Sequence, residues 1–219
     1  VSKLGFFYPP VWLLYILPAS LLPYSVSAIL FQVGSVFAAG IACAFLARNK
    51  TAGWLIFAFP TLVFSIVHGQ NGLLNTALLA TALACLERRQ QVWAGVLIGL
   101  MAYKPQFGIL IPFALIAGRE YRAFLSAALT TISMILFSIV AFGLEPWRLF
   151  FGNFAFVRTL LMEGWVNMGK YASVFGWLRQ YEVPADVAIS VQIGVGLLML
   201  FAVIWTWRQP LSIAVKGAV

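Results

Sequence analysis

The sequence predicts an all-α, polytopic helical membrane protein, and its composition, hydropathy and charge placement carry that prediction. Of its 219 residues, 63% are hydrophobic and 9% are charged, whereas a soluble globular chain has about 25% charged residues. The mean hydropathy is +0.96. The net charge of +8 comes from Lys and Arg in short stretches between apolar runs, as on the cytoplasmic side of membrane proteins. The expected partner is therefore a lipid bilayer and not a nucleic acid.

The first half of the chain contains one full-length span and several shorter apolar runs. Residues 25–47 form an apolar run of 23 residues, which is long enough to cross a bilayer. Residues 10–22 are bounded by prolines and too short to cross, so we expect them along the external interface. Residues 52–67 and 73–86 are apolar runs of 16 and 14 residues.

Two short apolar arms, residues 92–103 and 105–117, flank Lys104. Arms of this length rise about 18–21 Å as helices, less than the roughly 30 Å of a hydrocarbon core. We expect a hairpin whose tip ends part-way, beneath an aqueous, external-facing cavity. A single kinked span over residues 92–117 is the alternative, but it would place the basic loops before and after it on opposite sides.

Two full spans, residues 121–143 and 185–207, follow. Residues 144–184 between them are rich in aromatic residues and mixed in polarity, which indicates an external or interfacial segment. We treat 1–219 as a single transmembrane domain. Because the chain starts without Met and ends soon after an apolar run, we expect a fragment that lacks an N-terminal helix with the first external loop and further C-terminal helices.

The basic loops predict the orientation. Loops 48–50, 87–89 and 118–122 carry Lys and Arg and are assigned to the cytoplasm. The polar tips at 68–71, 103–106 and 143–147 then face the outside.

Lys104 is the most informative candidate residue. A lysine at the bilayer centre costs about 2.5–3.5 kcal/mol on insertion scales, and Pro105 breaks the helix where the charge stands. We predict that Lys104 binds a phosphate or another anion, with Gln106 at the same tip. The alternative is a lysine that snorkels to the interface.

Other polar candidates stand at apolar interruptions. His68, Gln70 and Asn71 offer hydrogen bonds at one tip, and His68 can exchange a proton near neutral pH. The alternative there is a plain turn, with Asn71 capping the next helix. Tyr8, before Pro9 and Pro10, is either a ligand contact or a helix start.

The chain has six carboxylates. An external general base must be Glu145, Glu163, Glu182 or Asp186, or lie outside this chain. One His and two separated Cys lack ligand spacing, so no metal site is predicted. Gly95 and Gly99 have the spacing of close helix packing.

An ordered set of residues carries a family resemblance. The set is Tyr8-Pro9-Pro10, Leu21-Leu22-Pro23, Gly69-Gln70-Asn71, Arg88-Arg89, Gly95 to Leu100, Lys104-Pro105, Arg119 and Arg122. Over roughly residues 6–145 it resembles the membrane glycosyltransferases of the GT-C fold, most closely glycosyltransferase family 87, a mannosyltransferase-like group.

The resemblance implies transfer of a hexose, such as mannose, from a polyprenyl monophosphate to a lipid or glycan acceptor. The reaction would occur on the extracytoplasmic side of the inner or plasma membrane. Lys104 matches the phosphate-holding residue, Gln70 and Asn71 the polar tip near the sugar, and Tyr8 the mouth of the cavity. The family's catalytic Asp precedes the Tyr-Pro-Pro segment, so it is expected outside this chain, which would be inactive alone. Whether a divalent cation is needed stays open.

Two rival interpretations remain. Broken helices with a buried cation also suit a membrane carrier or flippase-like subunit for a lipid-linked or anionic solute. A non-catalytic scaffold would tolerate a neutral residue in place of Lys104.

Overall fold

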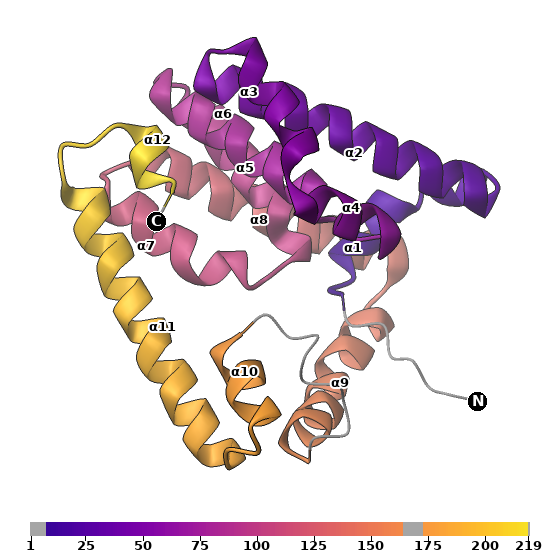
Figure 1. Cartoon of the computed structure of the whole chain (residues 1–219). Coiled ribbons are helices and arrows are strands. Elements are labelled where there is room, and N and C mark those ends of the chain that lie inside the picture. The colour runs from indigo at the N-terminus through magenta and orange to yellow at the C-terminus, as the bar shows by residue number, and fades with distance from the viewer. Residues whose placement is uncertain (1–7, 164–172, 219) are drawn as a thin grey trace.

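The computed structural model describes residues 8–163 and 173–218, and every regular element in these ranges is a helix, which confirms the all-α prediction (Figure 1). The elements, in chain order, are α1 (Val11–Ile16), η1 (Ala19–Leu21), α2 (Tyr24–Ala47), α3 (Lys50–Trp54), η2 (Leu55–Ala58), α4 (Pro60–Val67), α5 (Gly72–Glu87), α6 (Gln91–Gly99), η3 (Leu100–Tyr103), α7 (Phe107–Ala117), α8 (Tyr121–Phe142), α9 (Glu145–Met162), α10 (Val174–Gln180), α11 (Ala185–Arg208) and α12 (Ile213–Lys216).

Three described helices, α2, α8 and α11, are long and apolar enough to cross a membrane. The apolar helices α5, α6 with η3, and α7 are shorter, as the lengths of their sequence runs predicted. Most large side chains on α2, α8 and α11 are exposed, among them Phe37, Leu129 and Phe201. Because an exposed apolar helix surface is stable in lipid and not in water, these helices place the chain in a membrane.

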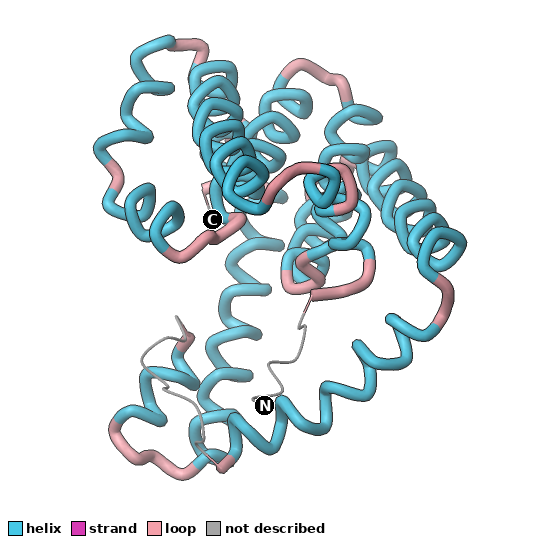
Figure 2. The backbone as a smooth tube through the Cα atoms, turned by 90° about the vertical axis from the view of Figure 1, so that its right-hand side faces the viewer, coloured by secondary structure: helices cyan, strands magenta, loops and turns pink. Residues whose placement is uncertain are grey.

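The centre of the fold is a row of packed helices in the order α2, α5, α6 and α8 (Figures 1 and 2). The α7 helix packs on α11, and α12 returns onto α5. The helices α9 and α10 and the start of α11 extend away from this row (Figure 1).

Glycines determine the α6–α8 contact. A Cβ at Gly95 would lie 2.3 Å from the carbonyl oxygen of Ala123, and one at Gly99 would lie 2.5 Å from the Cβ of Thr130. No real Cβ comes this close, so only glycine allows the two helices to approach to this distance. The predicted packing role of Gly95 and Gly99 is confirmed.

The apolar run at residues 52–67 does not form one helix. It is divided among α3, η2 and α4, with Pro60 as the first residue of α4. The residue before it, Phe59, is extended, with φ −85° and ψ 123°. Because the proline ring disfavours helical geometry in the preceding residue, the chain turns there.

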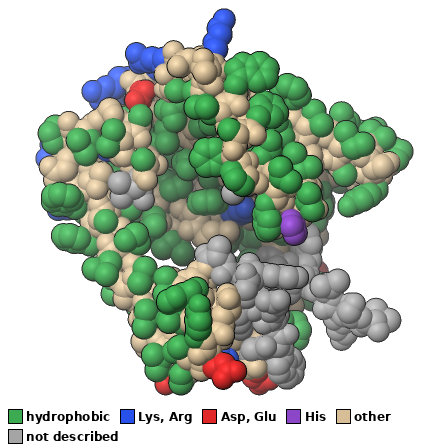
Figure 3. Space-filling model, viewed as in Figure 1, with side chains coloured by type: hydrophobic (Ala, Val, Ile, Leu, Met, Phe, Trp, Pro, Cys, Tyr) green, Lys and Arg blue, Asp and Glu red, His purple; other side chains and the backbone are tan. Residues whose placement is uncertain are grey.

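The basic loops meet at one end of the fold, which we call the basic end. One cavity there is lined by Arg48, Arg89, Gly118 and Lys216, which come from the three predicted loops and from α12. Figure 3 shows Lys and Arg side chains gathered at this end, with an acidic side chain among them, and further acidic side chains at the opposite end. Both ends of the segment between Arg89 and Gly118 therefore lie together, so the segment is a hairpin and not a single span.

Candidate functional site

Lys104 stands in the break between η3 and α7. Its φ of −125° and ψ of 83° are not helical, as expected for a residue before proline. The turn is closed by the Lys104 amide, which donates to the Met101 carbonyl at 2.9 Å, and by the Phe107 amide, which donates to the Lys104 carbonyl at 3.1 Å. The backbone thus fixes where the lysine leaves the helix, at the far end of α6 from Arg89.

Tyr103 anchors this break. Its side chain is fully buried, and its hydroxyl donates to the Oδ1 of Asn75 on α5 at 2.6 Å. Its ring lies 4.8 Å from the Trp12 ring and 5.0 Å from the Tyr15 ring, between centroids. The Tyr15 hydroxyl donates to the Leu100 carbonyl at 2.6 Å, so α1 holds η3 at a second point.

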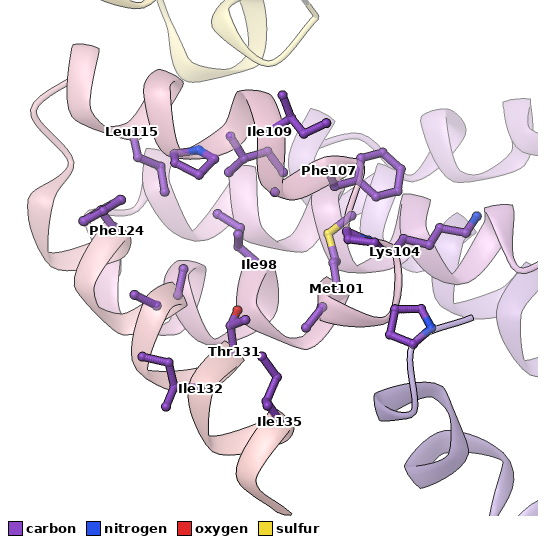
Figure 4. Close-up of a pocket in the computed structure, with 18 of the residues that line it drawn as sticks. Ile98, Met101, Lys104, Phe107, Ile109, Leu115, Phe124, Thr131, Ile132 and Ile135 are labelled. Carbon is purple, nitrogen blue, oxygen red and sulfur yellow. The ribbon is translucent and has the colours of Figure 1, made fainter. Parts of the chain in front are cut away.

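Beside this break lies a mainly apolar cavity of about 620 Å³. Its lining comes from Pro9 and from elements α6 to α9. Among the described residues that line it, Lys104 alone carries a charge. Figure 4 shows the labelled apolar side chains along the cavity, with Lys104 at one end and its side chain pointing away from them.

Aromatic side chains of α9 form one wall of the cavity: Trp147, Phe150, Phe151 and Phe154. Neighbouring rings in this group have centroids 5.1–6.1 Å apart. The Trp147 indole Nε1 donates to the Ser138 hydroxyl on α8 at 3.1 Å, which fixes the start of α9 against the bundle. The α9 helix, at the start of the segment 144–184 that was predicted to be external or interfacial, therefore also contributes to the cavity.

The polar tip at residues 68–71, before α5, does not line this cavity. His68 is exposed, stacks on Phe64 with centroids 4.1 Å apart, and has its Nδ1 3.0 Å from the Phe64 carbonyl oxygen. Gln70 is exposed in the turn made by Gly69, whose φ is +61°. Asn71 is 3% exposed, and its Oδ1 has no hydrogen-bond partner. Asn71 stands at the N-cap of α5 without a side-chain capping bond, so the capping interpretation was wrong.

The remaining predicted site residues lie at the edge. Tyr8 is half-buried and stacks on Trp12 at 5.4 Å, next to Pro9, which does line the cavity. Gln106 is exposed at the Lys104 turn and does not line the cavity. The structure therefore brings Tyr8 and Lys104 to the same region through Trp12 and Tyr103.

The carboxylates are elsewhere. All six lie in described residues, and none lines the cavity. Glu145 is exposed and pairs with Arg148 at 3.6 Å. Glu163, Glu182 and Asp186 are also exposed. No carboxylate of this chain is therefore in position to act as a base at the cavity.

Sequence reasoning missed Tyr103, Asn75 and Tyr15, the polar side chains that hold the break. The available signal was a tyrosine directly before Lys104 and an asparagine within the apolar run of α5. Each needs a buried partner in an apolar helix bundle.

Comparison with family models gives a match to glycosyltransferase family 87 over residues 6–217. The chain belongs to glycosyltransferase family 87. It is accordingly a glycosyltransferase, which takes a sugar donor and an acceptor, and membership favours this activity over the carrier interpretation. The family 87 match extends well beyond the 6–145 region of the sequence resemblance and includes α9, α10 and α11. No curated protein and no solved structure matches the chain.

Proposed function

We propose that this family 87 chain, together with a catalytic carboxylate from outside the given sequence, transfers a hexose, such as mannose, from a polyprenyl monophosphate to a lipid or glycan acceptor. The proposal rests on the apolar cavity at whose end Lys104 is the one charged residue among the described residues that line it. The apolar cavity of about 620 Å³ suits the isoprene units of the donor lipid. A lysine at one end of it suits a phosphate.

The chemistry favours a cation at this place. When the bond between the anomeric carbon and the phosphate oxygen breaks, negative charge grows on the leaving phosphate. An ammonium group near that oxygen stabilises the charge most in the transition state, and does so strongly where water is scarce. A lipid-borne leaving group also explains why the cation belongs within the apolar bundle, where an isolated lysine is costly.

The orientation is part of the proposal. Arg48, Arg89 and Lys216 gather at the basic end, which is assigned to the cytoplasm by the usual distribution of Lys and Arg. The α6 helix begins next to Arg89 and ends at the Lys104 break. Lys104 would then face the extracytoplasmic side of the inner or plasma membrane.

The polar residues at the tips complete the proposed site. Gln70 and Asn71 would contact the sugar, Tyr8 the mouth of the cavity, and Gln106 and His68 the phosphate or the acceptor. The general base is assigned to a carboxylate outside this sequence, as the family resemblance implies.

The test uses the full-length protein in detergent or nanodiscs, with a labelled short-chain polyprenyl-phosphate mannose as donor. We expect Lys104→Gln to weaken donor binding by roughly 10–100-fold, the loss of one charge-assisted hydrogen bond. Lys104→Arg should recover part of it. Lys50→Gln, which removes an exposed lysine from the basic loop at residues 48–50, is the matched control.

The assay is run with and without a divalent cation, because the phosphate can bind a metal of its own. Unchanged donor binding and transfer in Lys104→Gln would contradict the proposal. Movement of the donor between leaflets without sugar transfer would instead support a carrier.

A further inference from the structure

A second cavity, of about 710 Å³, lies at the basic end, on the other side of the bundle from Lys104. It is formed where α2, α5, α7 and α8 meet the C-terminal segment. Three cations and two carboxylates line it: Arg48, Arg89, Lys216, Glu87 and Glu120. Leu46, Leu86 and Leu211 supply apolar lining beside them.

The walls of this cavity are fixed by close contacts. The Ala214 amide donates to the Glu87 Oε1 at 3.3 Å, which ties α12 to the end of α5. A Cβ at Gly217 would lie 2.5 Å from a methyl carbon of Leu83. Because these contacts at Ala214 and Gly217 hold α12 against α5, the cavity is part of the folded structure.

Several charged side chains that line the cavity lack a partner within the described part of the chain. Among the described residues, Arg48, Arg89 and Lys216 form no ion pair. Glu120 is 7% exposed, and its Oε2 has no hydrogen-bond partner. A buried acceptor without a donor is unfavourable, so a ligand that brings a donor would stabilise this carboxylate.

We propose that this cavity binds the phosphoethanolamine headgroup of a phospholipid from the adjacent leaflet. The phosphate would lie against Arg48, Arg89 and Lys216, since guanidinium and ammonium groups bind phosphate with charge-assisted hydrogen bonds. The primary ammonium would donate to Glu120. The glycerol and the start of the acyl chains would lie against Leu211, which is 44% exposed.

Related headgroups satisfy only part of the cavity. Phosphatidylglycerol supplies the phosphate and hydroxyl donors but no cation, so the buried carboxylate of Glu120 would gain a hydrogen bond without compensation of its charge. Phosphatidylcholine supplies a cation without an N–H group and cannot donate a hydrogen bond. The pairing of cations with a buried carboxylate therefore selects a headgroup with both a phosphate and an N–H donor.

The experiment is native mass spectrometry of the delipidated full-length protein with phosphatidylethanolamine, phosphatidylcholine and phosphatidylglycerol of matched chains, added singly and in competition. We expect phosphatidylethanolamine to bind about tenfold more tightly than phosphatidylcholine, as befits a charge-assisted hydrogen bond. Glycerophosphoethanolamine is a further arm, because competition by this soluble headgroup shows recognition of the headgroup without the lipid tails.

Two variants locate the site. Glu120→Gln should remove the preference over phosphatidylcholine, and Lys216→Gln should weaken all three lipids. Glu145→Gln, an exposed carboxylate on α9, is the control and should leave binding unchanged. No preference in the wild-type protein would overturn the proposal even if one variant fails to fold. A preference that both variants retain would overturn the assignment to this cavity.

Discussion

At the residue scale, the position of Lys104 is set by an uncharged neighbour. Tyr103 is fully buried and bonded to Asn75, while Lys104 next to it lines the cavity. The tyrosine cannot move without leaving Asn75 unpaired, so the lysine is held at a fixed point of the turn. Tyr103 thus anchors the turn, while Lys104 supplies the charge. Lys104 forms no ion pair with any of the described residues.

Tyr103→Phe tests this anchor. It removes the hydroxyl and leaves the buried Asn75 Oδ1 without its donor, so we expect a loss of about 1–2 kcal/mol in stability. Thermal unfolding in detergent measures it. The control is Tyr24→Phe, because Tyr24 is 88% exposed and its change should be neutral. An equal effect of both substitutions would show that Tyr103 anchors nothing.

At the element scale, one part of α6 packs on α8 and another part positions the Lys104 turn. One face lies on α8 through Gly95 and Gly99, and its C-terminal end continues into η3 and the Lys104 turn. Because α8 also lines the cavity, the α6–α8 contact sets the position of the lysine relative to the apolar wall.

Gly95→Ala should disturb this contact. The added methyl group would meet the Ala123 carbonyl, which belongs to backbone and cannot swing aside. We expect destabilisation of roughly 1–3 kcal/mol, as for other overpacked sites, measured by thermal unfolding. Gly196→Ala on α11 adds the same methyl group where no atom lies within 4 Å. A stability as high as that of the Gly196 variant would show that α6 and α8 are not in close contact.

The α8 wall offers a test of what fills the cavity. Ala128→Trp places a large ring where a small half-buried side chain now lines the hollow. If the cavity holds isoprene units, transfer from long-chain donors should fall at least tenfold while short-chain donors are less affected. The measurement is kcat/KM against donor chain length, with Ala141→Trp, an exposed site beyond the lining, as control. A uniform loss for all lengths would place the lipid chain elsewhere.

Sequence reasoning predicted the helices better than their interruptions. The spans at 25–47, 121–143 and 185–207 match α2, α8 and α11 within a few residues, because long apolar runs leave the backbone no alternative in lipid. The division of the run at 52–67 among α3, η2 and α4 was not predicted, because hydropathy does not register the break before Pro60. Lys104 was found because a charge in an apolar run is conspicuous. The hydrogen bond between Tyr103 and Asn75 that holds its turn was not found, since a contact between positions 28 residues apart leaves no local pattern.

At the scale of the whole molecule, the fold separates two charged regions with an apolar band. The basic loops surround one end (Figure 3), and the Lys104 break lies at the far end of α6 from these loops. Since short helices such as α5 and α6 cannot cross a bilayer alone, we expect their tips to end part-way through it. A polar turn at that depth would suit the lipid-borne donor that we propose.

Cysteine labelling tests this arrangement directly. Cys43 and Cys85 are first replaced by alanine, and single cysteines are introduced at Gln70 and Arg89, both of which are exposed. In intact cells, a membrane-impermeant maleimide should label Gln70→Cys, whereas Arg89→Cys should label only after permeabilisation, because Lys and Arg loops stay on the cytoplasmic side. Blocking of both sites by the same permeable reagent controls for reactivity. Labelling of both from one side would place the 68–71 tip and the basic loops on the same face, which contradicts the proposed topology on which the extracytoplasmic assignment of the site rests.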